Sequence, residues 1–359
     1  HFFATLYPRM LIAILVIVGL SLLILGHEWG HFFAAKKFGL KVDEFGFGFP
    51  PRIFAWKRGE TEYSLNWLPF GGFVKIAGEN DRVNGDLTKL SDLSAVEKKR
   101  IFLFQPAWKR SVIILAGVAV NFVIGWILIS AVFMTGTERA LVVTEVQKNS
   151  PAAAVGILAG DVVDGYFESQ PFINFINENK GKEVEIRVKR GEEALSFKAT
   201  PRAETEPGEG ALGVGLAEAG FPKQGFFTAI GTGLIKTYEI GKLTVYSFYK
   251  LVAGLLTSGT LLQGVVGPVG IFTVAQQAGQ LGFVYLIQLV SLISINLAVI
   301  NLIPFPALDG GRFLFIMIEK AKGSPLPLKV EAIANGVGFA LLILLMLAIT
   351  VRDVAGWFS

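Results

Sequence analysis

Four long runs of apolar residues without charge dominate the pattern of the chain. The runs are Met10 to Gly26, Ser111 to Thr137, Leu251 to Leu308 and Ala332 to Val351. A helix that crosses the hydrocarbon core of a bilayer needs about 20 predominantly apolar residues. The third run is most continuously apolar over residues 283–303. We therefore predict a polytopic α-helical membrane protein with four transmembrane helices, over residues 8–38, 111–137, 283–303 and 330–351.

The charges between these runs predict an orientation in the membrane. Residues 36–110 contain 14 Lys or Arg residues, and the loop between the last two spans contains Arg312, Lys320, Lys322 and Lys329. The two tails offer only Arg9 and Arg352. Because Lys and Arg accumulate in cytoplasmic loops, we expect both tails outside and both loops in the cytoplasm. No small-residue cleavage site follows the first run, so we interpret it as a span and not as a removed signal.

The cytoplasmic segment 41–78 has the pattern of a β-rich loop. Residues 52–56 and 61–67 flank the polar turn Lys57-Arg58-Gly59-Glu60, as in a hairpin. The preceding stretch alternates aromatic residues with glycine from Phe45 to Phe49. Such aromatic residues suit a sheet that touches the membrane interface, and a plain cytoplasmic hairpin is the alternative. Residues 79–110 are predicted to form a basic cytoplasmic loop.

The segment between the second and third spans predicts a small α+β domain outside the cytoplasm, over residues 138–217. Strands are expected at residues 141–146, 183–188 and 194–199, and residues 204–210 have a linker composition. Residues 218–260 are predicted to be a linker and an amphipathic helix on the membrane surface, because charges recur at near-helical spacing. A soluble helix packed under the outer domain is the alternative.

The composition of the chain excludes several classes of protein and of chemistry. The chain is 52% hydrophobic and only 17% charged, which excludes both an ordinary soluble enzyme and a disordered chain. A net charge of +4 spread over 359 residues gives no support for a nucleic-acid partner. The sequence has no cysteine, so disulfides, thiol catalysis and thiolate metal sites are excluded.

The strongest chemical motif is H-E-x-x-H at the end of the first span. His27 and His31 are four residues apart, so on a helix both imidazoles lie on one face and can bind one ion. Glu28 is then beside the ion, where it can accept a proton from a metal-bound water. Ionisable residues in a membrane helix are costly and usually functional. The alternative is a pair of interfacial histidines that face lipid headgroups.

A catalytic zinc site uses three protein ligands and an open position, so a third ligand is needed. The remaining histidine, His1, is terminal, which leaves a carboxylate. Asp309 ends the charge-free third run, at the same predicted depth as the two histidines. Asp43 and Glu44 are rival ligands, and a helix cap before Gly310-Gly311 is the structural alternative for Asp309. Two histidines and one carboxylate can also hold other divalent ions.

These motifs resemble those of the site-2 proteases, specifically the bacterial intramembrane zinc metalloproteases of the RseP type. The resemblance covers nearly the whole chain. It rests on the H-E-x-x-H motif and on three further stretches, namely Gly46-Phe47-Gly48, Gly267-Pro268-Val269-Gly270 and residues 301–311. It implies zinc bound by His27, His31 and Asp309 in the ligand segment 304–312, with Glu28 as the base. It also implies that residues 41–78 form a re-entrant β-loop that presents an edge to the substrate. It further implies that the substrate or its oxyanion is contacted by Gly46, Phe47, Gly48, Asn296, Asn301 and Pro304.

The outer segment from Asn149 to Asp161 resembles the strand-to-loop region of a PDZ domain. Gly213-Val214-Gly215 is similar to the strand that follows its carboxylate-binding loop. The chain has room for a single domain of this kind. The interval between Asp164 and Lys180 is short for the helix that usually lines the peptide groove.

The motifs and the topology, together with this resemblance, imply an intramembrane zinc endopeptidase in the inner membrane of a bacterium, with its active site near the cytoplasmic side. Its expected substrates are single-span membrane proteins, such as an anti-sigma factor or a signal-peptide remnant, trimmed beforehand by an upstream site-1 protease. One alternative is an inactive membrane scaffold that binds peptide tails through its PDZ-like domain. A transporter or channel is a weaker alternative, because it favours charged or broken helices in matched halves.

Overall fold

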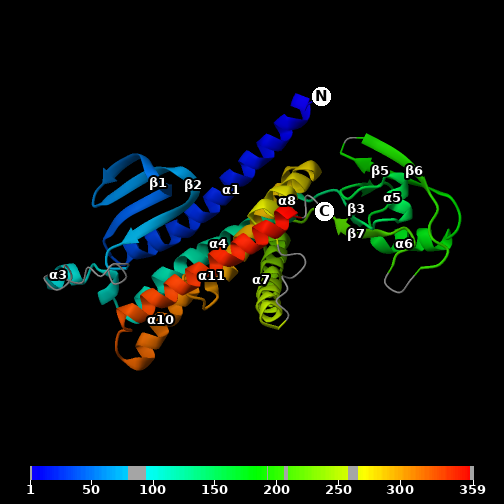
Figure 1. Cartoon of the computed structure of the whole chain (residues 1–359). Helices are drawn as coiled ribbons and strands as arrows, with labels where there is room; N and C mark the ends of the chain where they lie inside the picture. Colours follow the sequence, from blue (N-terminus) through cyan, green and yellow to red (C-terminus); the bar gives the residue numbers. More distant parts are fainter. Residues whose placement is uncertain (1, 80–93, 192, 206–208, 258–265, 356–359) are drawn as a thin grey trace. The chain divides into compact units, whose positions relative to one another are not determined.

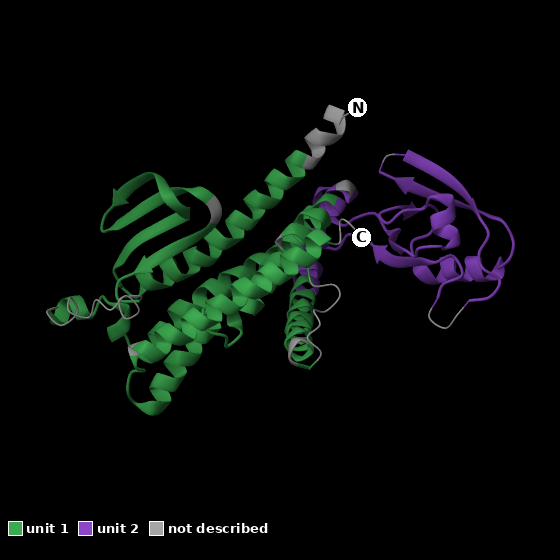
Figure 2. Cartoon of the chain, viewed as in Figure 1, with its two compact units in different colours: residues 1–129, 233–276, 286–359 green, residues 130–232, 277–285 purple. Residues whose placement is uncertain are grey.

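The computed structural model describes residues 2–79, 94–191, 193–205, 209–257 and 266–355. The chain divides into two compact units, each of which is described by itself (Figure 2). Unit 1 comprises residues 1–129, 233–276 and 286–359, and unit 2 comprises residues 130–232 and 277–285.

Long helices make up most of unit 1 (Figure 1). They are α1 (Phe2–Lys37), α4 (Ala107–Thr135), α9 (Phe283–Leu302), α10 (Asp309–Lys322) and α11 (Leu328–Ala355). The helices α7 (Phe226–Thr257) and α8 (Pro268–Leu281) each have residues in both units, as do α4 at its end and α9 at its start, and α3 (Ala95–Lys98) and η1 (Phe102–Phe104) are short. Four helical stretches of the described chain are long and apolar enough to cross a membrane, at residues 10–37, 107–135, 283–302 and 329–355. The four predicted apolar helices are therefore confirmed as candidate spans.

The segment that follows α1 is a small antiparallel sheet of β1 (Val42–Arg58) and β2 (Thr61–Ile76). Both strands double back, so that Gly46 pairs with Phe73 on one side and with Ser64 on the other. The segments of the sheet therefore follow the order 52–58, 61–66, 42–47, 72–76. The outer segments are 52–58 and 72–76, and residues 42–47 lie inside the sheet.

A buried apolar cluster joins the base of this sheet to the helices of unit 1. Its members come from the end of α1, the sheet, η1, α4 and α10, and include Ala35, Leu40, Val42, Ile113 and Ile316. Burial of these side chains fixes the position at which the chain leaves α1 and enters the sheet, since apolar area removed from water is the main favourable term.

The membrane helices themselves pack through small and polar residues. A Cβ atom added to Gly30 of α1 would lie 2.5 Å from the carbonyl oxygen of Ala116 in α4, so the two backbones meet at this crossing. Helix α9 is joined to α4 by two hydroxyl groups: Ser291 Oγ donates to Gly125 O at 2.8 Å, and Ser294 Oγ donates to Asn121 O at 2.7 Å. Such contacts are typical of helices in lipid, where apolar surface gains little by leaving one apolar medium for another.

A tight loop connects α9 to α10. Gly310 and Gly311 begin α10 against the loop backbone, and a Cβ atom on either would lie 2.2 Å from a carbonyl oxygen, of Ile303 or Phe305 respectively. The loop is held to α11 by the Ala307 N–H, which donates to Asn335 Oδ1 at 3.0 Å. Only residues without side chains fit at the two glycine positions, and this close packing places Asp309 at the first turn of α10.

Unit 2 contains a five-stranded antiparallel sheet with strand order β6-β5-β4-β3-β7. The strands are β3 (Ala140–Val146), β4 (Val162–Val163), β5 (Val184–Arg190), β6 (Glu193–Ala199) and β7 (Val214–Ala219), and the helices are α5 (Pro151–Val155) and α6 (Ser169–Glu178). The strands expected near residues 141–146, 183–188 and 194–199 are present as β3, β5 and β6.

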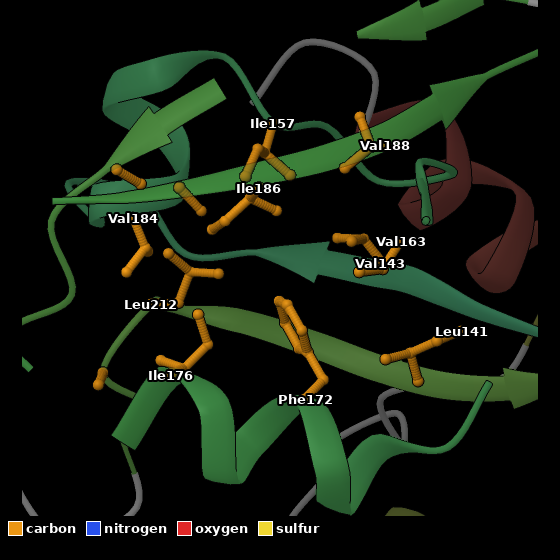
Figure 3. Packing of buried hydrophobic residues seen from close by; sticks show 13 residues of the cluster. Leu141, Val143, Ile157, Val163, Phe172, Ile176, Val184, Ile186, Val188 and Leu212 are labelled. Carbon is orange, nitrogen blue, oxygen red and sulfur yellow. The ribbon is translucent and has the colours of Figure 1, made fainter. Parts of the chain in front are cut away.

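The interval between Asp164 and Lys180 holds the ten-residue helix α6, which is nearly three turns long. Phe172 and Ile176 lie four residues apart on this helix and point into the core, toward residues such as Leu212 of the facing layer (Figure 3).

Candidate metal centre

The two histidines of the H-E-x-x-H motif lie one turn apart near the end of α1, and both are buried. His27 Nε2 lies 3.2 Å from His31 Nε2. Asp309, from the start of α10, brings its Oδ2 atom to 3.0 Å from His27 Nε2 and 3.4 Å from His31 Nε2. Residues 27, 31 and 309 therefore converge on one point, as the sequence predicts for a metal site.

The three ligand atoms fit a divalent ion of the size of zinc. Tetrahedral zinc with bonds of about 2.0–2.2 Å keeps its ligand atoms roughly 3.3 Å apart, close to the three separations found here. Asp309 Oδ2 is fully buried and makes no hydrogen bond among the described residues. A buried carboxylate oxygen without a hydrogen bond is costly unless a cation is bound beside it.

The two histidines favour the ionised form of Asp309 when no metal is bound. Burial alone would raise the pKa of the Asp309 carboxyl, but hydrogen bonds and positive charge from His27 and His31, when both rings are protonated, outweigh it. The pKa therefore lies well below its usual range. Leu308 occupies the N-cap position of α10, so the alternative interpretation of Asp309 as the cap itself is wrong.

Rival carboxylates in the sheet have other partners. Asp43 forms an ion pair with Lys41 at 2.7 Å. Glu44 is buried and accepts hydrogen bonds from Arg52, Ser64 and Lys75. Within the described ranges, the only group of three or more His, Cys, Asp or Glu side chains whose ligand atoms converge within 4.8 Å is His27, His31 and Asp309.

Helix α4 shapes the pocket in which the imidazoles lie. A Cβ atom on Gly117 would lie 2.4 Å from His31 Nε2 and 2.9 Å from His27 Cε1, so this position must lack a side chain. His31 Nδ1 lies 2.9 Å from the carbonyl oxygen of Ile113, which can only accept a hydrogen bond. His31 Nδ1 therefore carries the proton, and Nε2 keeps its lone pair for the metal. Sequence reasoning missed Gly117, because its importance depends on where α1 and α4 cross.

Glu28 lies between the ligand group and an outer segment of the sheet. Its side chain is partly buried, and a Cβ atom on Gly72 would lie 3.4 Å from Glu28 Cγ. Residue 72 begins the outer segment 72–76. The carboxylate is thus next to a ligand histidine in sequence and next to the sheet edge in space.

The residues expected to contact substrate lie in three places: in the sheet, in α9 and in the loop that follows α9. Gly46 lies inside the sheet, and the room that it leaves is taken by the Phe73 ring, 2.4 Å from the position of an added Cβ atom. Asn296 Oδ1 lies 2.6 Å from Thr244 Oγ1 of α7. Asn301 is partly buried in the last turn of α9, and Pro304 is exposed in the following loop. Substrate contact by these residues, and by Phe47 and Gly48, stays a prediction.

Comparison with known proteins is consistent with this geometry. The family model described as "Peptidase family M50" matches residues 15–345. A Clostridium perfringens protein assigned as a zinc metalloprotease is 34% identical over 346 residues, which cover 95% of this chain and 98% of the relative. The zinc metalloprotease RasP of Shouchella clausii is 31% identical, over 94% of this chain and 97% of the relative. The regulator of sigma-W protease RasP of Bacillus subtilis is 28% identical, over 97% and 99%.

Proposed function

The chain belongs to peptidase family M50 and is a zinc metalloprotease; from this premise we propose that it cleaves peptide bonds within or next to the transmembrane segments of single-span membrane proteins. The observation that supports this proposal is the buried group of His27, His31 and Asp309 at the end of a candidate membrane span. A protease whose two ligand histidines lie in a candidate span is suited to substrates that are themselves in the bilayer.

The protein residues divide the chemistry among them. When bound, the zinc lowers the pKa of a water molecule to about 7 and withdraws charge from the substrate carbonyl. His27, His31 and Asp309 would hold it. Glu28 would accept the proton of the attacking water and pass it to the leaving amine, a contribution worth about 10²–10⁴ in rate. The Asn301 amide would donate a hydrogen bond to the developing oxyanion.

The substrate must be extended before it can react. In a membrane helix the backbone carbonyl is hydrogen-bonded within the helix and hidden from water. Among the described residues, the outer segment 72–76 pairs on one side only and lies beside Glu28, so an unwound substrate would add to it as a further strand. This segment suits the role better than Gly46–Gly48, because residues 42–47 already pair on both sides.

Unit 2 is proposed to be an extracytoplasmic PDZ-like domain. A cavity of about 420 Å³ lies between α6 and the edge strand β7, and its apolar lining includes Phe172, Ile176, Leu212, Val214 and Leu216. Gly210 to Gly213 close one part of it, and Lys180 is also in the lining. A peptide could pair with β7 while its side chains enter the cavity. We propose that this domain lies outside the cytoplasm together with both termini.

Two variants test the catalytic assignment in the purified full-length protein. We expect Glu28→Gln to keep its zinc and lose cleavage of a transmembrane model substrate by at least 10²-fold, because only the base is removed. We expect Asp309→Ala to lose both zinc and cleavage. Asp43→Ala, a carboxylate paired with Lys41 at the surface, is the control and should keep both. Normal cleavage by Glu28→Gln or full zinc occupancy in Asp309→Ala would contradict the proposal.

A second proposed function, peptide binding by unit 2, is favoured by one observation, the cavity beside β7. It predicts that the wild-type protein binds peptide tails as well as cleaving transmembrane peptides. The same assay on a substrate with and without its outer domain tests whether an upstream protease must act first. We expect the trimmed form to be cleaved faster.

A further inference from the structure

Asn121 of α4 is a buried polar residue that the chemistry described so far does not use. It is fully inaccessible to solvent. Its side-chain Nδ2 lies 3.4 Å from His27 Nδ1, and its Oδ1 has no hydrogen-bond partner among the described residues. A carboxamide buried in an apolar helix bundle is costly, so its contact with a ligand histidine needs a physical account.

Each of the two ligand histidines requires a hydrogen-bond acceptor for the proton on its Nδ1 atom. Both direct Nε2 toward Asp309 Oδ2, so Nε2 is the metal-binding atom on each ring. A neutral imidazole that binds metal through Nε2 carries its proton on Nδ1, and this proton needs an acceptor. For His31 the acceptor is the carbonyl oxygen of Ile113. For His27 the neighbouring polar group is the Asn121 carboxamide.

The orientation of that carboxamide is coupled to the tautomer of His27. With Nδ2 toward the ring, the amide can only donate, which leaves the proton on Nε2 and prevents metal binding there. Turning the amide by 180° changes almost nothing in its shape and brings Oδ1 to the ring as an acceptor. Either orientation leaves one end of the amide without a protein partner in the described chain, so the contact with His27 decides between them.

We propose that Asn121 is the positioning residue of His27: its Oδ1 accepts the hydrogen bond from His27 Nδ1–H and thereby directs the Nε2 lone pair at the metal. Helix α4 then orients both histidines, through the Ile113 carbonyl and the Asn121 side chain, and makes room for them at Gly117. The backbone carbonyl of Asn121 accepts the hydroxyl of Ser294 from α9, so Ser294 contacts this residue without contacting its side chain. The inference rests on the metal site of the proposed function.

The test compares side chains of similar size that differ in their ability to accept a hydrogen bond. Asn121→Asp keeps an acceptor, and Asn121→Leu removes it. Ser294→Ala is the control, since it removes the contact to the Asn121 backbone and leaves the side chain facing His27. Each full-length variant is measured in detergent for zinc content, for the rate of zinc loss to a chelator, and for the visible spectrum of its Co²⁺ form.

Loss of such an outer hydrogen bond commonly lowers metal affinity by about 10–100-fold. We expect this loss, and an altered Co²⁺ spectrum, in Asn121→Leu. Asn121→Asp should retain zinc and a tetrahedral Co²⁺ spectrum, and Ser294→Ala should match the wild type. Wild-type zinc retention in Asn121→Leu would overturn the proposal, and so would equal zinc loss in the Asp and Leu variants, which would show that an acceptor at this position does not retain the metal.

The outcome for the metal site itself is separate. If Asp309→Ala retains zinc, the proposed site is wrong, whatever the Asn121 variants do. If Asp309→Ala loses zinc while Asn121→Leu keeps it, only the inference about Asn121 fails.

Discussion

The crossing of α1 and α4 and the core of unit 2 are built on opposite principles. In unit 2, large apolar side chains such as Leu141, Ile157 and Phe172 fill the space between the sheet and its helices (Figure 3). At the helix crossing, residues without side chains, Gly30 and Gly117, let the backbone of one helix approach the other and its histidines. Unit 2 is stabilised by large side chains that fill its core. The crossing depends on glycines that let the two helices approach closely.

The difference follows from the surroundings. In water, burial of apolar area stabilises a fold by about 25 cal/mol per Å². Between helices in lipid that gain is nearly absent, so close contact and hydrogen bonds decide which helices associate. The two regions should therefore respond in opposite ways to a methyl group added or removed, and the predictions below test this contrast.

The largest effect is expected from one added methyl group at the crossing. Gly117→Ala places a Cβ atom within 2.4 Å of His31 Nε2, so the ligand histidines must move. We expect zinc content below a tenth of the wild-type value and no cleavage. Gly336→Ala in α11 is the control, because an added Cβ atom there meets nothing within 4 Å. Elemental analysis of both purified variants measures the zinc content. Full zinc occupancy in Gly117→Ala would contradict the proposed contrast between the helix crossing and the core of unit 2.

A removed side chain should have the next largest effect, in unit 2. Leu141→Ala leaves a cavity at a position that is 0% exposed, which costs about 2–5 kcal/mol. We expect faster limited proteolysis within residues 130–232 and unchanged zinc content. Leu158→Ala, at a position 53% exposed, is the matched control and should change neither. Zinc loss in Leu141→Ala would show that the two regions do not fail separately.

The smallest effect is expected from the hydroxyl groups between α4 and α9. Hydrogen bonds between membrane helices contribute about 0.6 kcal/mol each, so Ser291→Ala with Ser294→Ala should cost roughly 1 kcal/mol. Thermal unfolding in detergent measures it. The control is Thr350→Ala, since Thr350 Oγ1 bonds only within its own helix, to Met346 O. A loss of several kcal/mol in the double variant would mean that polar contacts dominate this interface.

Much of the fold and of the candidate site could be predicted because it depends on local pattern. Runs of uncharged residues predict the four candidate spans, alternation predicts β3, β5 and β6, and the four-residue spacing of His27 and His31 places them on one helix face. Asp309 could be predicted as the third ligand, because it is the first charged residue after the charge-free run that ends at Leu308.

By itself the sequence determined the class of the protein, its candidate spans and the chemical types gathered at the metal, because these depend on composition and on periodicity along one element. Only the tertiary structure decided that Gly117 makes room for the imidazoles, that Asn121 faces His27, and that residues 72–76 form the outer segment beside Glu28. These facts depend on which faces of distant segments meet. Periodicity fixes the face on which a side chain lies, but the neighbour of that face is set by packing between elements.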